Sequence, residues 1–179
     1  MALSLCMTVR EWAVLDMALC FFRGAPANSH AAACLAKHCR WLHKRLRQIG
    51  IKADYVSVAA PEEVHAEQRL VIDGPFDFED ELILPLPKQI VCSVAHLGLI
   101  IIETHADPSL PPMLDYEAEE LLVCRQYLTE LREQGIKLKR LVGGWRRMRW
   151  HRGTRQYAFP PLVADRLHKY YRRVGAGLN

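Results

Sequence analysis

The sequence predicts an α+β domain, with N-terminal helices packed on an antiparallel sheet. Three observations lead to this class. Helical apolar periodicity fills the first 50 residues, strand-like composition dominates from about residue 53 to 102, and a further long helical pattern follows from Asp115. With 179 residues the chain is long enough for one domain with its own core, so we expect a single domain over 1–179, of which 136–179 forms a basic C-terminal extension.

Two helices are expected first. Thr8 and Glu11 have the spacing of a capping box, and the apolar repeat that follows predicts a helix over 8–23. A second helix starts at Asn28 or Ser29 and closes at Gly50. Its apolar residues recur every three to four positions, which leaves the basic residues between them largely solvated: Lys37, Arg40, Lys44, Arg45 and Arg47.

The middle of the chain predicts strands. Residues 53–59 and 64–72 are rich in residues that favour strands, whereas 76–86 is expected to be a surface excursion because its prolines exclude a central strand. The almost continuous apolar runs 90–95 and 97–102 are expected to sit in the middle of the sheet. A helix over 115–134, a basic piece and a last short helix over 162–173 complete the chain.

Composition limits the cellular context. No segment has the length and apolarity to cross a membrane, and charges interrupt residues 1–22, so we expect a cytoplasmic protein without a leader. The six cysteines lack the close spacing of a secreted disulfide framework, which favours reduced thiols. The formal net charge is +4, but residues 137–155 carry eight Lys or Arg and no acid, which indicates a docking surface.

Four short segments carry a resemblance to a known superfamily. They are Asn28-Ser29-His30, Gln48-Ile49-Gly50-Ile51, His96-Leu97-Gly98-Leu99 and Asp107-Pro108-Ser109. In order and type they resemble papain-like and transglutaminase-like cysteine enzymes. The resemblance covers about a quarter of the chain, in 26–58 and 91–110.

The resemblance implies a hydrolase or acyl transferase that acts on a peptide, isopeptide or amide bond of a protein or peptide through an acyl-enzyme. Ser29 would stand at the nucleophile position, His96 would be the base and Asp107 would orient its ring. Asn28 and His30 would flank the active-site entrance, and backbone N–H groups at the helix start would bind the oxyanion. No cofactor follows from this chemistry.

The nucleophile departs from the superfamily pattern. Ser29 stands where a cysteine is expected, and the nearest thiol, Cys34, lies more than one helical turn further on. Three explanations remain open: Ser29 replaces a cysteine in an inactive form, Cys34 is the nucleophile, or the resemblance is only architectural. His65 and His105 compete with His96 as the base, but both fall in more polar or turn-like segments.

The sequence also bears on two other kinds of site, a zinc site and a basic binding surface. A zinc site on the second helix would need a ligand from another element, and the chain has no CxxC or HExxH, so we predict no metal. The basic segment 137–155 combines cations with stacking rings, which favours a non-catalytic module that binds nucleic acid or protein as the alternative function. The residues expected to contact that partner or the substrate are Trp145, Arg146, Arg147, Arg149 and Trp150.

Overall fold

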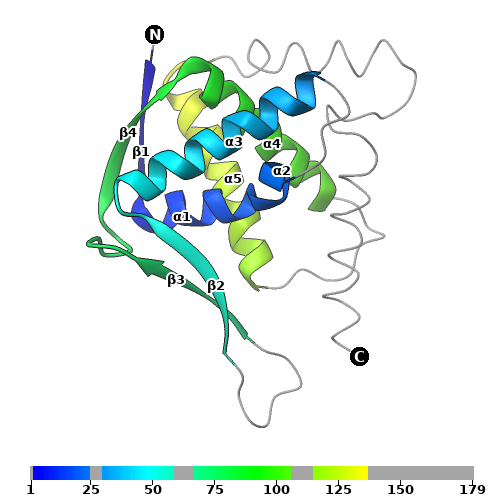
Figure 1. Ribbon diagram of the computed structural model, residues 1–179. Coiled ribbons are helices and arrows are strands. Elements are labelled where there is room, and N and C mark those ends of the chain that lie inside the picture. The colour runs from blue at the N-terminus through cyan, green and yellow to red at the C-terminus, as the bar shows by residue number, and fades with distance from the viewer. Residues whose placement is uncertain (1, 25–29, 59–66, 106–114, 137–179) are drawn as a thin grey trace.

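The computed structural model describes residues 2–24, 30–58, 67–105 and 115–136 (Figure 1). Within these ranges the elements follow in the order β1 (Ala2–Thr8), α1 (Val9–Ala18), α2 (Cys20–Gly24), α3 (His30–Gln48), β2 (Lys52–Val58), β3 (Glu67–Asp73), β4 (Glu81–Pro87), α4 (Lys88–His105) and α5 (Asp115–Glu133). Helices and small antiparallel sheets occur together, which confirms the α+β class.

The described strands form two separate two-stranded sheets. In the first, β1 pairs with β4 so that Ala2 faces Pro87 and Thr8 faces Glu81. Alternate residues of this sheet point to opposite faces: Leu5 and Leu84 are buried, whereas Cys6 and Ile83 are exposed. One face of the sheet therefore belongs to the core and the other is open.

The second sheet is the hairpin of β2 and β3; β2 contacts α1, and the far end of the hairpin extends beyond the helices (Figure 1). It starts where α3 ends at Gly50, whose φ of 99° lies in the left-handed region that favours glycine. The N–H of Ile51 donates to the carbonyl of Leu46, which satisfies one of the last helical carbonyls. Gly135 and Ile136 close α5 in the same way, with a hydrogen bond to Leu131.

The core lies where α1 and α4 meet the inner face of the first sheet, with α3 and α5 packed against these two helices. Trp12 of α1 is completely buried, and its indole N–H donates to the carbonyl of Leu82 in β4 at 3.0 Å. The largest fully buried side chains come from every one of these helices and from the sheet: Trp12, Tyr127, Phe22, Leu5, Leu15, Leu19, Leu42, Leu46, Ile51, Leu86 and Leu97.

The first helical pattern was predicted correctly in its start but not in its continuity. The capping box at Thr8 and Glu11 is present, with hydrogen bonds of 3.1 Å and 2.8 Å. However, the single helix expected over 8–23 is divided into α1 and α2 at Leu19. Arg23 of α2 donates to both the carbonyl and the carboxylate of Asp16, and these bonds hold α2 against the end of α1.

The prediction of strands over 90–95 and 97–102 is wrong, because these residues belong to helix α4. A continuous apolar run is compatible with any element that is buried on all sides, and this run is long enough for a helix. At Gly98 the helix packs on α5, where a Cβ would meet the Cβ of Cys124 at 3.8 Å, an ordinary van der Waals contact.

Two strands of the first sheet were not predicted as such. Residues 2–8 were not expected to form a strand, and β4 falls in the segment 76–86 that was expected to be a surface excursion. The prolines of β4 did exclude a central strand, since β4 has only β1 as a neighbour among the described strands. The predicted helix over 162–173 and the basic extension lie outside the described residues.

Candidate functional site

Only part of the predicted catalytic set lies in the described ranges. Ser29, Asn28 and Asp107 lie outside them, as do the basic segment 137–155 with its tryptophans and the competing base His65. Of His30 and His105 only the helical backbone is described. Cys34 lies on α3 and His96 lies on α4. Because Ser29 and Asp107 lie outside the described residues, the triad expected from the sequence stays a prediction.

His96 is buried in the middle of α4, with 8% of its surface exposed. Burial lowers the pKa of its imidazole from 6.5 to about 4. The ring is therefore neutral at pH 7. A neutral, enclosed imidazole is poorly suited to a standing ion pair with a thiolate, which needs the charged ring.

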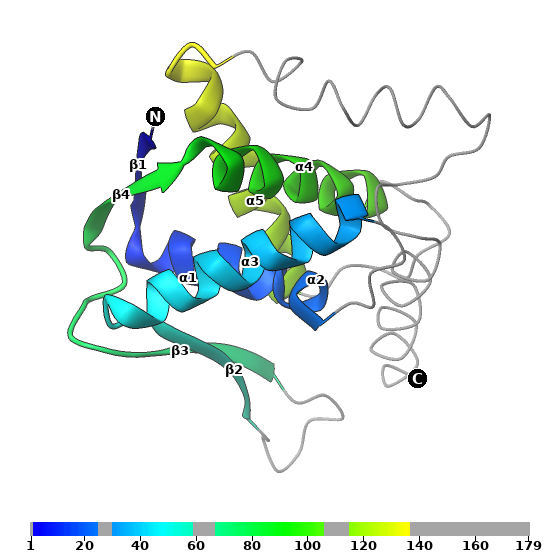
Figure 2. The same cartoon turned by 45° about the horizontal axis from the view of Figure 1, so that its top comes forward.

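A second histidine connects α3 to α4. The Nδ1 atom of His38 lies 2.6 Å from the hydroxyl oxygen of Ser93, which is itself 8% exposed. Burial, and then the nearby charge of Lys37, lower the pKa of His38. The two helices cross here with their chains running in opposite senses (Figures 1 and 2). This contact satisfies a buried hydroxyl and fixes one helix against the other.

A third polar cluster joins α1, α2 and α3 around Asp16. Its carboxylate, 4% exposed as a residue, accepts from Arg23 at 2.6 Å and from Nδ1 of His43 at 2.7 Å. A carboxylate that accepts from Nδ1 fixes the imidazole tautomer with a proton on that nitrogen. Cys39 packs close by, and burial raises the pKa of its thiol to about 12. Because the thiol stays protonated, this cluster is best explained as a polar clamp between three helices.

The solvent-facing side of α3 carries the densest positive charge of the described helices. Its apolar side is buried through Leu35, Leu42 and Leu46, whereas five cations and no acid occupy the rest of the helix: Lys37, Arg40, Lys44, Arg45 and Arg47. All except the half-buried Arg45 are exposed. The array runs from Lys37 to Arg47, and these ten residue steps at 1.5 Å each make about 15 Å along the helix axis.

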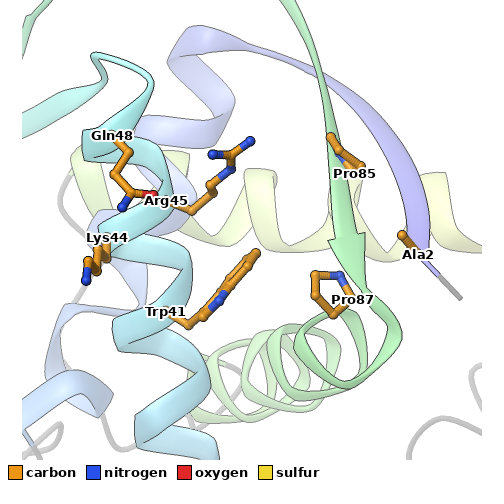
Figure 3. A pocket seen from close by; sticks show the side chains of 7 residues that line it. All are labelled: Ala2, Trp41, Lys44, Arg45, Gln48, Pro85 and Pro87. Carbon is orange, nitrogen blue, oxygen red and sulfur yellow. The ribbon is translucent and has the colours of Figure 1, made fainter.

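A hollow of about 430 Å³ lies between this side of α3 and the open face of the first sheet (Figure 3). Trp41 and Arg45 extend toward β4, where Pro85 and Pro87 line the opposite wall. The remaining lining residues are Ala2, Lys44 and Gln48. Trp41 is 38% exposed, and the other exposed residues on this side of α3 are mostly cations.

The five cations were noted in the sequence as solvated residues and the prolines as strand breakers, but Trp41 was not expected to take part in a site. An aromatic residue that interrupts the polar side of an amphipathic helix was the available signal. Acidic residues gather elsewhere, in the exposed turn before β4 that contains Asp77, Glu79 and Asp80. The exposed side of α3 is therefore positive without interruption, whereas α5 carries both signs, in Arg125, Arg132 and Glu133.

Two kinds of feature are absent from the described ranges. No group of three or more His, Cys, Asp or Glu side chains is arranged there to hold a metal ion, and the helices there lack the length and apolarity needed to span a bilayer. The six cysteines all lie in these ranges and form no disulfide. Comparison with protein-family models, with curated proteins and with solved structures found no match to this chain.

Proposed function

We propose that this protein is a non-catalytic nucleic-acid-binding module, and that the exposed side of α3 is part of its binding surface. The observation that carries this proposal is the array of five cations without an acid along one helix. Nucleic acid is the partner whose charge repeats at a short, regular spacing, and Lys and Arg that neutralise successive phosphates release bound counterions.

The arrangement of the cations favours a regular polyanion over an acidic protein. Lys37, Lys44 and Arg47 follow each other along the exposed side of α3 at intervals of seven and three residues, so they recur along the helix axis. An acidic protein surface also attracts cations, but its charges do not repeat at a short fixed spacing as phosphates do. In the sequence, a further eight cations and two tryptophans follow in 137–155, outside the described residues.

Charge reversal with a matched control tests the proposal. The double variant Lys44→Glu/Arg47→Glu changes the α3 surface, and Arg125→Glu/Arg132→Glu makes the same change in net charge at exposed positions of α5, which packs against α1 and α4. Binding of a labelled oligonucleotide is followed by fluorescence anisotropy at a series of salt concentrations. The α3 variant is expected to bind at least about tenfold more weakly, and the slope of log K against log salt should fall by about 1.4 for a single strand.

Two results would contradict the proposal. If both double variants weaken binding equally, only net charge matters and α3 is not the surface. If the natural protein binds polyglutamate more tightly than any oligonucleotide at the same salt, the partner is an acidic protein.

A second candidate is the cysteine-peptidase-like activity with a papain-like arrangement, in which Cys34 is the nucleophile and His96 the base. One observation favours it. Cys34 lies one turn before His38 on α3, and His96 lies one turn after Ser93 on α4. Because the helices run in opposite senses, both lie on the same side of the His38–Ser93 contact.

Thiol alkylation distinguishes this candidate. If His96 activates Cys34, iodoacetamide should modify Cys34 rapidly at pH 6, and the variant His96→Gln should slow that reaction at least about tenfold. Cys6, which is exposed on β1, provides the reference rate within the same molecule. Equal rates at Cys34 and Cys6, unchanged by His96→Gln, would exclude an activated thiol.

A further inference from the structure

The hollow beside α3 has a chemical character that phosphate binding alone does not explain. Its walls are a tryptophan on one side and two prolines on the other, while Lys44 and Arg45 stand at the same site. Its volume of about 430 Å³ lies within the roughly 300–1,000 Å³ of ordinary small-ligand sites. A cation array for phosphates needs neither an aromatic wall nor a recess.

We propose that this hollow receives one unpaired base of a single-stranded nucleic acid, stacked on Trp41, while Lys44 and Arg45 hold the neighbouring phosphates. This inference rests on the nucleic-acid function proposed above and names the form of nucleic acid that is bound. A nucleotide joins a base to a phosphate, so it presents an aromatic plane and a negative charge close together. The hollow presents the complementary pair, because Trp41 and Arg45 are one turn apart on α3 and both extend into it (Figure 3).

The geometry favours an unpaired base. A base in a duplex is covered on both faces by its neighbours, so it cannot stack on a side chain without leaving the helix. Single-strand-binding proteins instead combine a positive groove with aromatic side chains on which successive bases stack. Trp41 lines a recess between a helix and a sheet, which a splayed base can enter and a stacked pair cannot.

Gln48 gives the hollow a polar group as well. It follows Trp41 by seven residues, two turns further along α3, and lines the same hollow. Its amide has both donors and an acceptor, so it suits the edge of a base whatever the identity of that base. The hollow should therefore accept several bases and discriminate mainly against duplexes.

The test compares two single-stranded ligands of equal phosphate charge with a duplex, which carries about twice that charge. They are an oligothymidylate of about 12 nucleotides, the same length of abasic backbone without bases, and a duplex of that length, all measured by anisotropy in the full chain at one salt concentration. We expect the single strand to bind about tenfold more tightly than the abasic strand and the duplex. Trp41→Ala should remove most of that difference, and Trp41→Phe should keep part of it.

Leu122→Ala is the matched control, because Leu122 is an exposed apolar residue on α5 and lies away from the hollow. It should leave all three affinities unchanged. If the single strand and the abasic strand bind equally and Trp41→Ala binds like the natural protein, the base pocket is refuted while the phosphate surface stands. If none of the three ligands binds, the nucleic-acid function itself is refuted.

Discussion

Acidification should destabilise this protein through His96, and the burial of that side chain fixes the sign of the effect. The pKa of His96 is about 4 in the folded chain and 6.5 when the imidazole is exposed to water. Between these two values the unfolded chain binds more protons than the folded chain, so stability falls as pH falls. The contribution of neutral His96 is therefore complete above about pH 6.5 and lost progressively toward pH 4.

The magnitude follows from the two pKa values. At about 1.4 kcal/mol per pH unit, lowering the pKa from 6.5 to about 4 corresponds to about 3 kcal/mol in full. About 2 kcal/mol of this should already be lost at pH 5, where the unfolded imidazole is almost fully charged and the folded one is still neutral. That loss is a substantial part of the free energy of unfolding of a typical domain, which is roughly 5–15 kcal/mol.

The assay is urea denaturation at pH 7, 6 and 5 for the natural chain and for His96→Gln, which cannot take up a proton. The free energy of unfolding of the natural chain should fall by about 2 kcal/mol more than that of His96→Gln between pH 7 and pH 5. His38→Gln is the comparison, since burial also lowers the pKa of His38 but this side chain is only half-buried. Parallel pH profiles for the natural chain and His96→Gln would refute the reasoning, because they would mean that His96 is hydrated in the folded protein.

Three substitutions elsewhere test how the described elements are held. Asp16→Asn should lower the free energy of unfolding by about 3 kcal/mol, since it leaves a largely buried arginine without its counter-charge; urea denaturation measures this, and a neutral outcome would contradict the clamp. Gly50→Ala should lower the melting temperature more than Gly135→Ala, because both have positive φ but only at Gly50 would the new Cβ lie 3.0 Å from a proline ring. Thr8→Ala should cost about 1 kcal/mol through loss of the helix cap, whereas Thr8→Ser should restore it; equal stability of the two variants would mean that the cap contributes nothing.

The elements that could be predicted are those whose boundaries depend on local chemistry. The capping box at Thr8 and the glycines that end α3 and α5 act through hydrogen bonds to residues three to five positions away, so the sequence alone contains both partners. The starts and ends of these helices were accordingly placed within one or two residues. Only the division at Leu19 was missed, and its cause is the arginine of α2 that reaches back to Asp16.

The elements that could not be predicted depend on tertiary contacts. Whether residues 90–102 form strands or a helix is decided by what surrounds them, and α5 covers one side of the run through Cys124. In the same way, β1 exists because β4 pairs with it from about 80 residues further along the chain. The clamp at Asp16 and the hollow beside Trp41 likewise join side chains from different elements, and no spacing in the sequence marks them.

The charge of α3 is more simply explained by a partner than by the fold. Pairs of like charge at spacings of three and four, such as Arg40 with Lys44 and Lys44 with Arg47, each destabilise a helix by a few tenths of a kcal/mol. Only the cations of the last turn gain from the helix dipole, so Lys37 and Arg40 receive no such compensation. The buried leucines of the helix supply most of its stability, and on the other side Arg40 also donates to the carbonyl of Arg23 in α2 at 2.8 Å. The excess of positive charge on this face is not needed for that contact, and the composition of the face suits a ligand that brings the missing negative charge.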